Sequence, residues 1–257
     1  MKRLLLLCGA LLIFGAPAAF AAAGLNFTWS PTNACQSPQI TNQTFACDAN
    51  DAVFTMVGSF MPGVQATQFY GIEVIVDGQS DGANIPSWWQ AFNDGSCRQN
   101  SVSPGAAFLA GGGCTKLWSA GASGGLGAWQ TTDYPPPTGN VPAANRLRFK
   151  IAYVMATARV NLNVSKEYSA FQLIMDSNNS INDPAADPPI VACPGCLVPV
   201  TLLLQQINVL DEAGAGSFEA ITTELTNRCI TWQSSTVACA VVPTRNRTWG
   251  EIKSLYR

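Results

Sequence analysis

The sequence predicts an all-β protein, a jelly-roll-like β-sandwich with long loops and a short C-terminal helix. Three observations lead to this fold class. Apolar and polar residues alternate over several short runs, clusters of Gly, Pro, Asn and Asp separate these runs, and no window of ten or more residues carries the 3.6-residue apolar stripe of a helix. A parallel α/β architecture is therefore disfavoured, and two packed antiparallel sheets are the economical way to bury the apolar faces.

The clearest predicted strand is Arg146–Met155. Apolar side chains occupy every second position of this run, and Arg146, Arg148 and Lys150 lie between them, so we expect one face in the core and the other in water. Similar runs predict further strands at residues 26–29, 52–60, 68–76, 168–175, 200–210, 217–223 and Cys229–Trp232.

Residues 22–247 are expected to form a single sandwich domain, because the strands on either side of the Pro-rich stretches are too few for two sandwiches. The Gly-rich residues 111–127 predict a long surface loop, stapled by Cys97 and Cys114. Capping boxes predict two short helices. One spans about two turns from Ser87, and the other opens at Thr248 and forms a helical tail over residues 248–257.

The amino terminus has the composition of a signal peptide. Lys2 and Arg3 precede an apolar run, and small residues follow up to a cleavage site after Ala21 or Ala23. We therefore expect residues 1–21 to be removed and the protein to be secreted, in the periplasm or outside the cell. No other stretch is long and apolar enough to span a membrane. The remaining chain has 12 basic and 16 acidic residues and no basic run, so nucleic acid is not an expected partner.

Removal of the signal peptide also removes Cys8 and leaves an even number of cysteines, which in an exported chain predicts disulfides. The eight are Cys35, Cys47, Cys97, Cys114, Cys193, Cys196, Cys229 and Cys239. Because they come in close pairs along the chain, nearest-neighbour pairing is the simplest prediction, clearest where Pro194 and Gly195 place a turn between two cysteines. The alternatives are a redox site at Cys193 and Cys196, or a four-cysteine zinc site built from Cys193, Cys196, Cys229 and Cys239.

The composition excludes several function classes. Hydrophobic residues make up 47% of the chain and charged residues 12%, which excludes a disordered protein. The chain contains no histidine, so a Ser-His-Asp triad and His-containing metal sites are excluded. Ser80 and Ser123 lie in G-x-S-x-G patterns, but without a histidine base we interpret these glycines as turn residues. We expect a protein without a catalytic centre and without a cofactor.

One segment has a pattern that could bind calcium. Side-chain oxygens occur at alternate positions, and such hard ligands suit Ca²⁺. They belong to Asp176, Asn178, Ser180, Asn182 and Asp187. Ile181 stands where an EF-hand needs glycine and Pro184 follows, so a polar loop is the alternative.

The adjacent Trp88 and Trp89 are candidates for a binding platform, because an exposed aromatic ring stacks on the apolar face of a sugar. If their turn is helical, one ring would fill the core and the other would reach solvent beside Gln90 and Asn93. Packing in the core or under a lid is the alternative. A glycoside hydrolase acting through two carboxylates is a further possibility, since that chemistry needs only two acids.

Several segments carry a resemblance to other proteins. They are residues 45–47 (Phe-Ala-Cys), 81–83 (Asp-Gly-Ala), 86–90 (Pro-Ser-Trp-Trp-Gln), 95–98 (Gly-Ser-Cys-Arg), the Cys193–x–x–Cys196 pair and the ending at 244–257. Together they resemble segments of secreted bacterial proteins of this size that have no assigned activity. This resemblance implies export and a shared fold. The ending Trp-Gly-x-Ile-Lys-x-Leu-Tyr-Arg is similar to the tails of other exported chains and implies sorting or docking, with a helix packed on its own domain as the alternative.

Taken together, these patterns predict a secreted, non-catalytic binding or structural protein at the cell surface or in the medium. Its expected partner is an extracellular glycan or another surface protein. A carbohydrate-binding module or a glycoside-active enzyme is the alternative.

Overall fold

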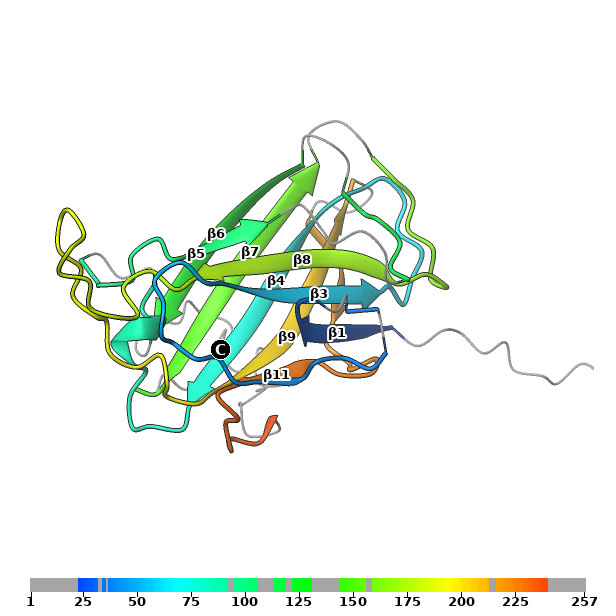
Figure 1. The fold of residues 1–257 in the computed structure, drawn as a ribbon. Helices are drawn as coiled ribbons and strands as arrows, with labels where there is room; N and C mark the ends of the chain where they lie inside the picture. The colour runs from blue at the N-terminus through cyan, green and yellow to red at the C-terminus, as the bar shows by residue number, and fades with distance from the viewer. Residues whose placement is uncertain are drawn as a thin grey trace, which may run out of the picture.

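The computed structural model describes residues 23–31, 34–35, 37–91, 95–105, 113–118, 122–130, 144–155, 159–212 and 216–239. This part of the chain is an all-β sandwich of two packed sheets (Figure 1), which confirms the predicted fold class. The strands are β1 (Gly24–Trp29), β2 (Asn42–Gln43), β3 (Val53–Met61), β4 (Phe69–Ser80), β5 (Val102–Gly105), β6 (Ala122–Gln130), β7 (Arg146–Met155), β8 (Tyr168–Asp176), β9 (Val200–Asp211), β10 (Gly216–Ile221) and β11 (Cys229–Trp232).

The smaller sheet has the strand order β1-β3-β8-β5, with antiparallel neighbours throughout. The larger sheet has the order β2-β11-β9-β4-β7-β6, and β10 pairs with β9 beyond the end of β11. Among the pairings between the described strands, only that of β2 with β11 is parallel, and two isolated bridges, Leu25 with Glu224 and Thr115 with Tyr168, are parallel as well. Between the described strands, the chain crosses from one sheet to the other at every connection except β6–β7, β9–β10 and β10–β11, so strands distant in sequence pair within each sheet.

The core lies between the two sheets and is built from alternate residues of each strand. Phe27 and Phe171 are in contact within it, with ring centroids 5.9 Å apart. Tyr153 of β7 spans the sandwich, since its hydroxyl donates a 2.6 Å hydrogen bond to the Gly105 carbonyl on β5. Burial raises the pKa of this phenol, so the hydroxyl keeps its proton and remains a donor.

The strand predictions hold wherever apolar and polar residues alternate. Arg146–Met155 and Cys229–Trp232 have the predicted bounds, and the other six predicted strands differ from the observed ones by one to four residues at their ends. The interpretation of residues 111–127 as a surface loop is wrong, because β6 begins at Ala122. Glycine-rich strands lack the apolar alternation that identifies a strand in sequence, and β6 forms because β7 supplies its hydrogen-bonding partner.

The helix predicted from Ser87 is shorter than expected. It is one 3-10 turn, Ser87–Trp89, with no side-chain cap, and so the capping-box prediction is wrong here. The signal peptide at 1–21 and the helical tail at 248–257 lie outside the described residues, and both remain predictions. Within the described chain, no helix is long and apolar enough to cross a membrane.

Candidate functional site

Three connections meet at one end of the sandwich, which we call the loop end: residues 44–52 before β3, 81–101 between β4 and β5, and 177–199 between β8 and β9 (Figure 1, left). Asn50 joins the first to the third, because its side chain donates to the Ile181 carbonyl at 3.1 Å and accepts from the Ile181 amide at 2.9 Å. The Trp88 amide joins the second to the third through a 3.0 Å hydrogen bond to the Pro194 carbonyl. The loops therefore support one another.

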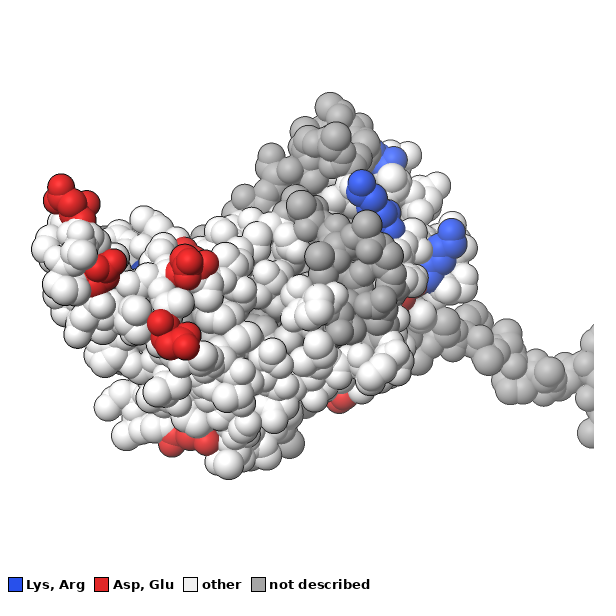
Figure 2. Space-filling model, in the orientation of Figure 1, with Lys and Arg blue, Asp and Glu red and all other residues white. Residues whose placement is uncertain are grey.

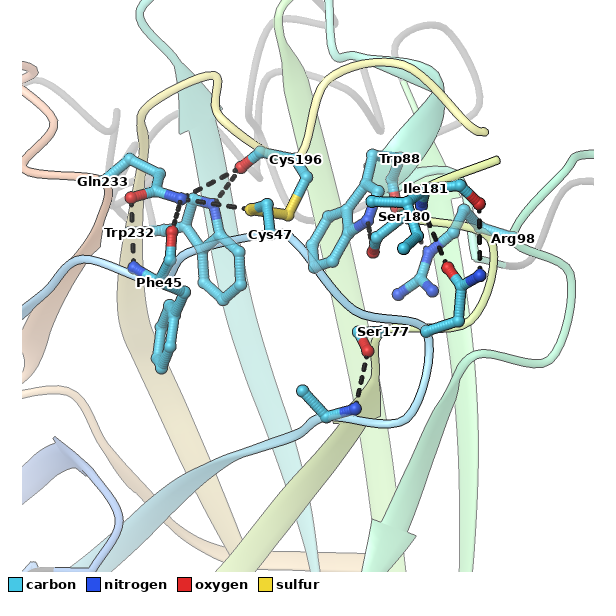
Figure 3. The surroundings of a disulfide bond; sticks show 12 residues. Phe45, Cys47, Trp88, Arg98, Ser177, Ser180, Ile181, Cys196, Trp232 and Gln233 are labelled. Atoms are coloured by element: carbon cyan, nitrogen blue, oxygen red, sulfur yellow. Dashed lines mark hydrogen bonds between the residues drawn. A yellow bond between two sulfur atoms is a disulfide. The ribbon is translucent and has the colours of Figure 1, made fainter. Parts of the chain in front are cut away.

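Two disulfides fasten the loop end. Cys196 bonds to Cys47 across 149 residues of sequence, and Cys193 bonds to Cys97 across 96. The loop that carries Cys193 and Cys196 is thus attached to both neighbouring loops. Figure 3 shows the Cys47–Cys196 bond beside Trp232, whose indole N–H donates to the Cys196 carbonyl at 2.6 Å. Such cross-links limit the conformations that the loops can adopt.

The predicted nearest-neighbour pairing is confirmed only for Cys229–Cys239. The other three expected pairs, Cys35–Cys47, Cys97–Cys114 and Cys193–Cys196, are wrong, because Cys35 bonds to Cys114 and the remaining four form the two loop-end disulfides. The redox site at Cys193 and Cys196 and the zinc site that also includes Cys229 and Cys239 are wrong as well, since all four sulfurs are in disulfides.

The Pro194–Gly195 turn explains why its two flanking cysteines bond elsewhere. Gly195 has a φ of +112°, and a Cβ atom there would lie 2.1 Å from the Cβ of Pro86. The turn is therefore packed against the 3-10 segment, and Cys193 and Cys196 contact different loops on either side of it.

Peptide mapping of the oxidised protein is expected to recover Cys35–Cys114, Cys47–Cys196, Cys97–Cys193 and Cys229–Cys239. Because only Pro194 and Gly195 separate Cys193 from Cys196, proteolysis between them at acidic pH must precede mass spectrometry. Fragments joining Cys193 directly to Cys196 would contradict the structure, and so would a substantial content of free thiol.

The predicted aromatic platform is not present, because Trp88 and Trp89 are both buried. Successive side chains of a 3-10 helix differ in direction by about 120°, and the two rings meet edge to face at a centroid distance of 5.4 Å. Both also pack on Trp232, at 4.9 Å and 5.5 Å. The expectation that one ring reaches solvent is therefore wrong, since the loop above them covers both.

The other two platform residues do not form a sugar-binding surface with these rings. The side chain of Gln90 donates to the Ile85 carbonyl at 3.3 Å and is partly buried. Asn93 lies outside the described residues. The rings contribute to a cluster that also includes Trp29, Phe45 and Phe54, and this cluster supports the loops from below.

Arg98 organises the underside of the loop end. Its guanidinium lies 4.3 Å from the Trp88 ring centroid and donates to the Trp88 carbonyl, to the carbonyls of Asp176 and Asn178, and to the Asp176 carboxylate at 3.4 Å. Burial lowers the pKa of Arg98 to about 10, although Asp176 acts in the opposite direction. The side chain is therefore still cationic at neutral pH and balances the oxygens around it.

Four of the five residues of the candidate calcium site have partners within the chain. Asp176 and Asn178 interact with Arg98, and Ser180 accepts a 2.9 Å hydrogen bond from the Trp88 indole. Asn182 accepts from the Ala192 amide at 2.8 Å, and Asp187 is exposed. Across the described residues, no group of three or more Cys, Asp or Glu side chains could hold a metal ion. Calcium binding thus remains an untested alternative to the expectation of no cofactor.

The outer surface of the loop end combines apolar side chains with carboxylates. Val191 and Leu197 are 75% and 67% exposed, and Val53 and Ile181 are exposed nearby. The three loops of the loop end also carry exposed acids; these are Asp48, Asp51, Asp81 and Asp187. In the view of Figure 2 the acidic side chains gather mainly at this end, whereas the visible Lys and Arg lie mainly at the other. Apolar groups held in place by cross-linked loops are typical of a protein-contact surface.

Sequence reasoning did not identify the roles of two arginines. In the sequence, Arg98 belongs only to one of the segments that carry the resemblance. The one signal that could have indicated its role is its position beside a cysteine in a chain with few charged residues. Arg148 was expected to face water, but it is buried and bonded to Asp77 through two hydrogen bonds of 2.5 and 2.6 Å. The alternation correctly predicts the sheet face of Arg148, but it does not show whether other residues cover that face.

The fold and the loop end define a class: an all-β sandwich with four disulfides, whose cross-linked loops present apolar and acidic side chains. Comparison with known proteins narrows this class no further, because no protein-family model matches the chain and no curated protein matches it significantly.

Proposed function

We propose that this is a secreted, non-catalytic binding protein that contacts another extracellular protein through the loop end. The observation that carries the proposal is the exposure of Val191 and Leu197 on loops fastened by two long-range disulfides. Exposed apolar groups on an immobilised surface lose little conformational entropy when a partner binds. The exposed carboxylates around them favour a partner with basic residues.

The absence of catalytic function is supported by what the polar groups do. The chain has no histidine, and three loop-end acids, Asp81, Asp176 and Asp183, accept hydrogen bonds from the chain itself. Glycan binding was the alternative, but its support came from an exposed tryptophan, and both candidate rings are buried. A contact between apolar loops and a protein surface therefore fits the geometry better than stacking on a sugar.

The test compares the wild-type mature protein with a Val191→Asp, Leu197→Asp variant. Partners would be isolated from the surface fraction of the source cells, identified, purified, and titrated against each form by calorimetry. We expect the double variant to bind at least about tenfold more weakly, because each substitution removes apolar contact area and adds a negative charge, while its melting temperature stays near that of the wild type.

A matched control is Val160→Asp, which changes an exposed valine that pairs with Phe69 at the start of β4, away from the loop end. It should bind as the wild type does. Equal affinity of all three forms would contradict a loop-end site. A glycan array run with and without calcium covers the alternative, and turnover of a polysaccharide that disappears on substitution of a single Asp or Glu would overturn the non-catalytic assignment.

A further inference from the structure

A row of four side chains crosses the larger sheet on the face that points away from the core. The row contains Arg148 of β7, Asp77 of β4, Leu203 of β9 and Cys229 of β11, each directly opposite the next in register. We call it the outer row. Its residues alternate with core-facing ones, and Leu203 with Cys229 forms an apolar cluster separate from the main core.

The outer row is buried, although the face on which it lies is not buried throughout. The exposed fractions are 4% for Arg148, 1% for Asp77, 2% for Leu203 and 6% for Cys229. On the same face, Val154 is 40% exposed, and the Glu73 and Lys150 side chains are 37% and 42% exposed. One face of an antiparallel sheet is commonly solvated, so the burial of this row means that other parts of the chain cover it.

Residues 233–239 follow β11 and approach the outer row from the end of the sheet at which β9 begins. Thr201, next to Leu203 on the same face, donates a 2.8 Å hydrogen bond to the Val237 carbonyl, and its hydroxyl oxygen lies 2.7 Å from the Ser235 hydroxyl. Asp81 accepts two 2.9 Å hydrogen bonds from Thr236. Cys239 then bonds to Cys229, which is the last member of the row. The next residues of the chain are therefore attached at the end of the outer row.

We infer that the C-terminal segment, residues 240–257, docks on the outer row of its own domain. The disulfide places its first residue beside Cys229, and the sequence offers an apolar stripe of Trp249, Ile252 and Leu255 at helical spacing. Adjacent strands are about 4.8 Å apart, so the row from β11 to β7 is roughly 14 Å long. Eighteen residues reach that far even if ten of them are helical, since the rise is about 1.5 Å per residue in a helix and about 3.3 Å in extended chain.

Docking of this segment explains why the outer row combines two apolar residues with a buried ion pair. An apolar cover over Leu203 and Cys229 removes water from the neighbouring Asp77–Arg148 pair, and a two-bond ion pair is the arrangement that tolerates this loss. The inference concerns a different face from the loop end and does not depend on the proposed function.

Limited trypsin digestion of the full mature, oxidised protein tests the inference, because Arg245, Arg247 and Lys253 lie in the segment. Cleavage at these sites should be slow in the wild type. It should be about tenfold faster or more in Leu203→Ser, which removes the apolar contact and raises the population of the open segment. The control is Leu210→Ser, at an outward position of the same strand that lies away from the row.

A second measurement covers the case in which Leu203→Ser unfolds the domain. Trp249→Ser with Ile252→Ser leaves the sheet unchanged, and it should accelerate cleavage at Arg247 by a similar factor while the disulfides remain intact. The inference is overturned if wild-type cleavage at Arg247 is as fast as in a free peptide of residues 240–257. It is also overturned if Leu203→Ser and Leu210→Ser behave alike, which would assign the cover to another segment, or if the wild type is a dimer that loses both its protection and its association when the tail is altered.

Discussion

Replacing Asp77 with alanine is expected to lower the free energy of unfolding by about 3–5 kcal/mol, because it leaves the buried Arg148 guanidinium without its carboxylate. Asp77 and Arg148 are opposite each other on β4 and β7, both nearly inaccessible, and joined by two short hydrogen bonds. Removal of the carboxylate takes away an opposite charge and two hydrogen bonds that compensate the guanidinium for its lost hydration. Urea unfolding of the mature, oxidised protein measures the change.

The matched control is Glu73→Ala. Glu73 lies on the same strand and the same face as Asp77, and it pairs with Lys150 at 3.5 Å, but both of these side chains are substantially exposed. Such a pair contributes about 0–1 kcal/mol, so Glu73→Ala should be almost neutral. Equal losses in the two variants would show that the burial of the Asp77–Arg148 pair has no energetic consequence. An apolar double variant, Asp77→Leu with Arg148→Met, should recover much of the lost stability.

The second large effect is expected from removal of the Cys97–Cys193 disulfide by a double substitution with serine. The bond closes a loop of 96 residues, and the loop-closure entropy of the unfolded chain corresponds to about 4–5 kcal/mol for a loop of this size. The native loop end would also lose one of the two covalent bonds that hold residues 177–199. Both the unfolding free energy and the proteolytic resistance of this loop should therefore fall.

Removal of Cys229–Cys239 serves as the comparison. This bond closes a loop of only 10 residues, for which the same entropy argument predicts about 3 kcal/mol. The variant should thus be the more stable of the two, and its loop end should keep its resistance to proteolysis. The reverse order would mean that native-state strain, rather than loop size, determines how much each disulfide contributes.

The loop end shows which features can be predicted from local sequence patterns and which cannot. The turn at Pro194–Gly195 was predicted from two residues, and it is present with Gly195 in the left-handed region. The disulfide partners of the flanking cysteines were not predicted, because they depend on which loops meet after the chain has crossed repeatedly between the sheets. Proximity in sequence is a poor guide to pairing when antiparallel strands bring distant loops to the same end of a sandwich.

The prediction that one ring of the tryptophan pair reaches solvent was wrong for a related reason. The geometry of one 3-10 turn determines the directions of the Trp88 and Trp89 rings. Whether each ring is buried depends on which other segments of the chain lie in those directions. Trp232 comes from the other end of the chain, and the loop through Pro194 covers the turn from outside. Both rings are therefore buried, and the site suggested by their exposure does not form.

The sequence by itself determined the features that follow from local order and composition. Alternation determined the strand Arg146–Met155 and the all-β class, the even cysteine count predicted four disulfides, and the missing histidines excluded triad chemistry. Only the tertiary structure decided which cysteines bond, that Arg98 lies under the loops, and that the outward Asp77 and Arg148 are buried. The physical reason is that periodicity assigns a side chain to a face, whereas burial and pairing depend on segments that sheet topology brings to that face from elsewhere in the chain.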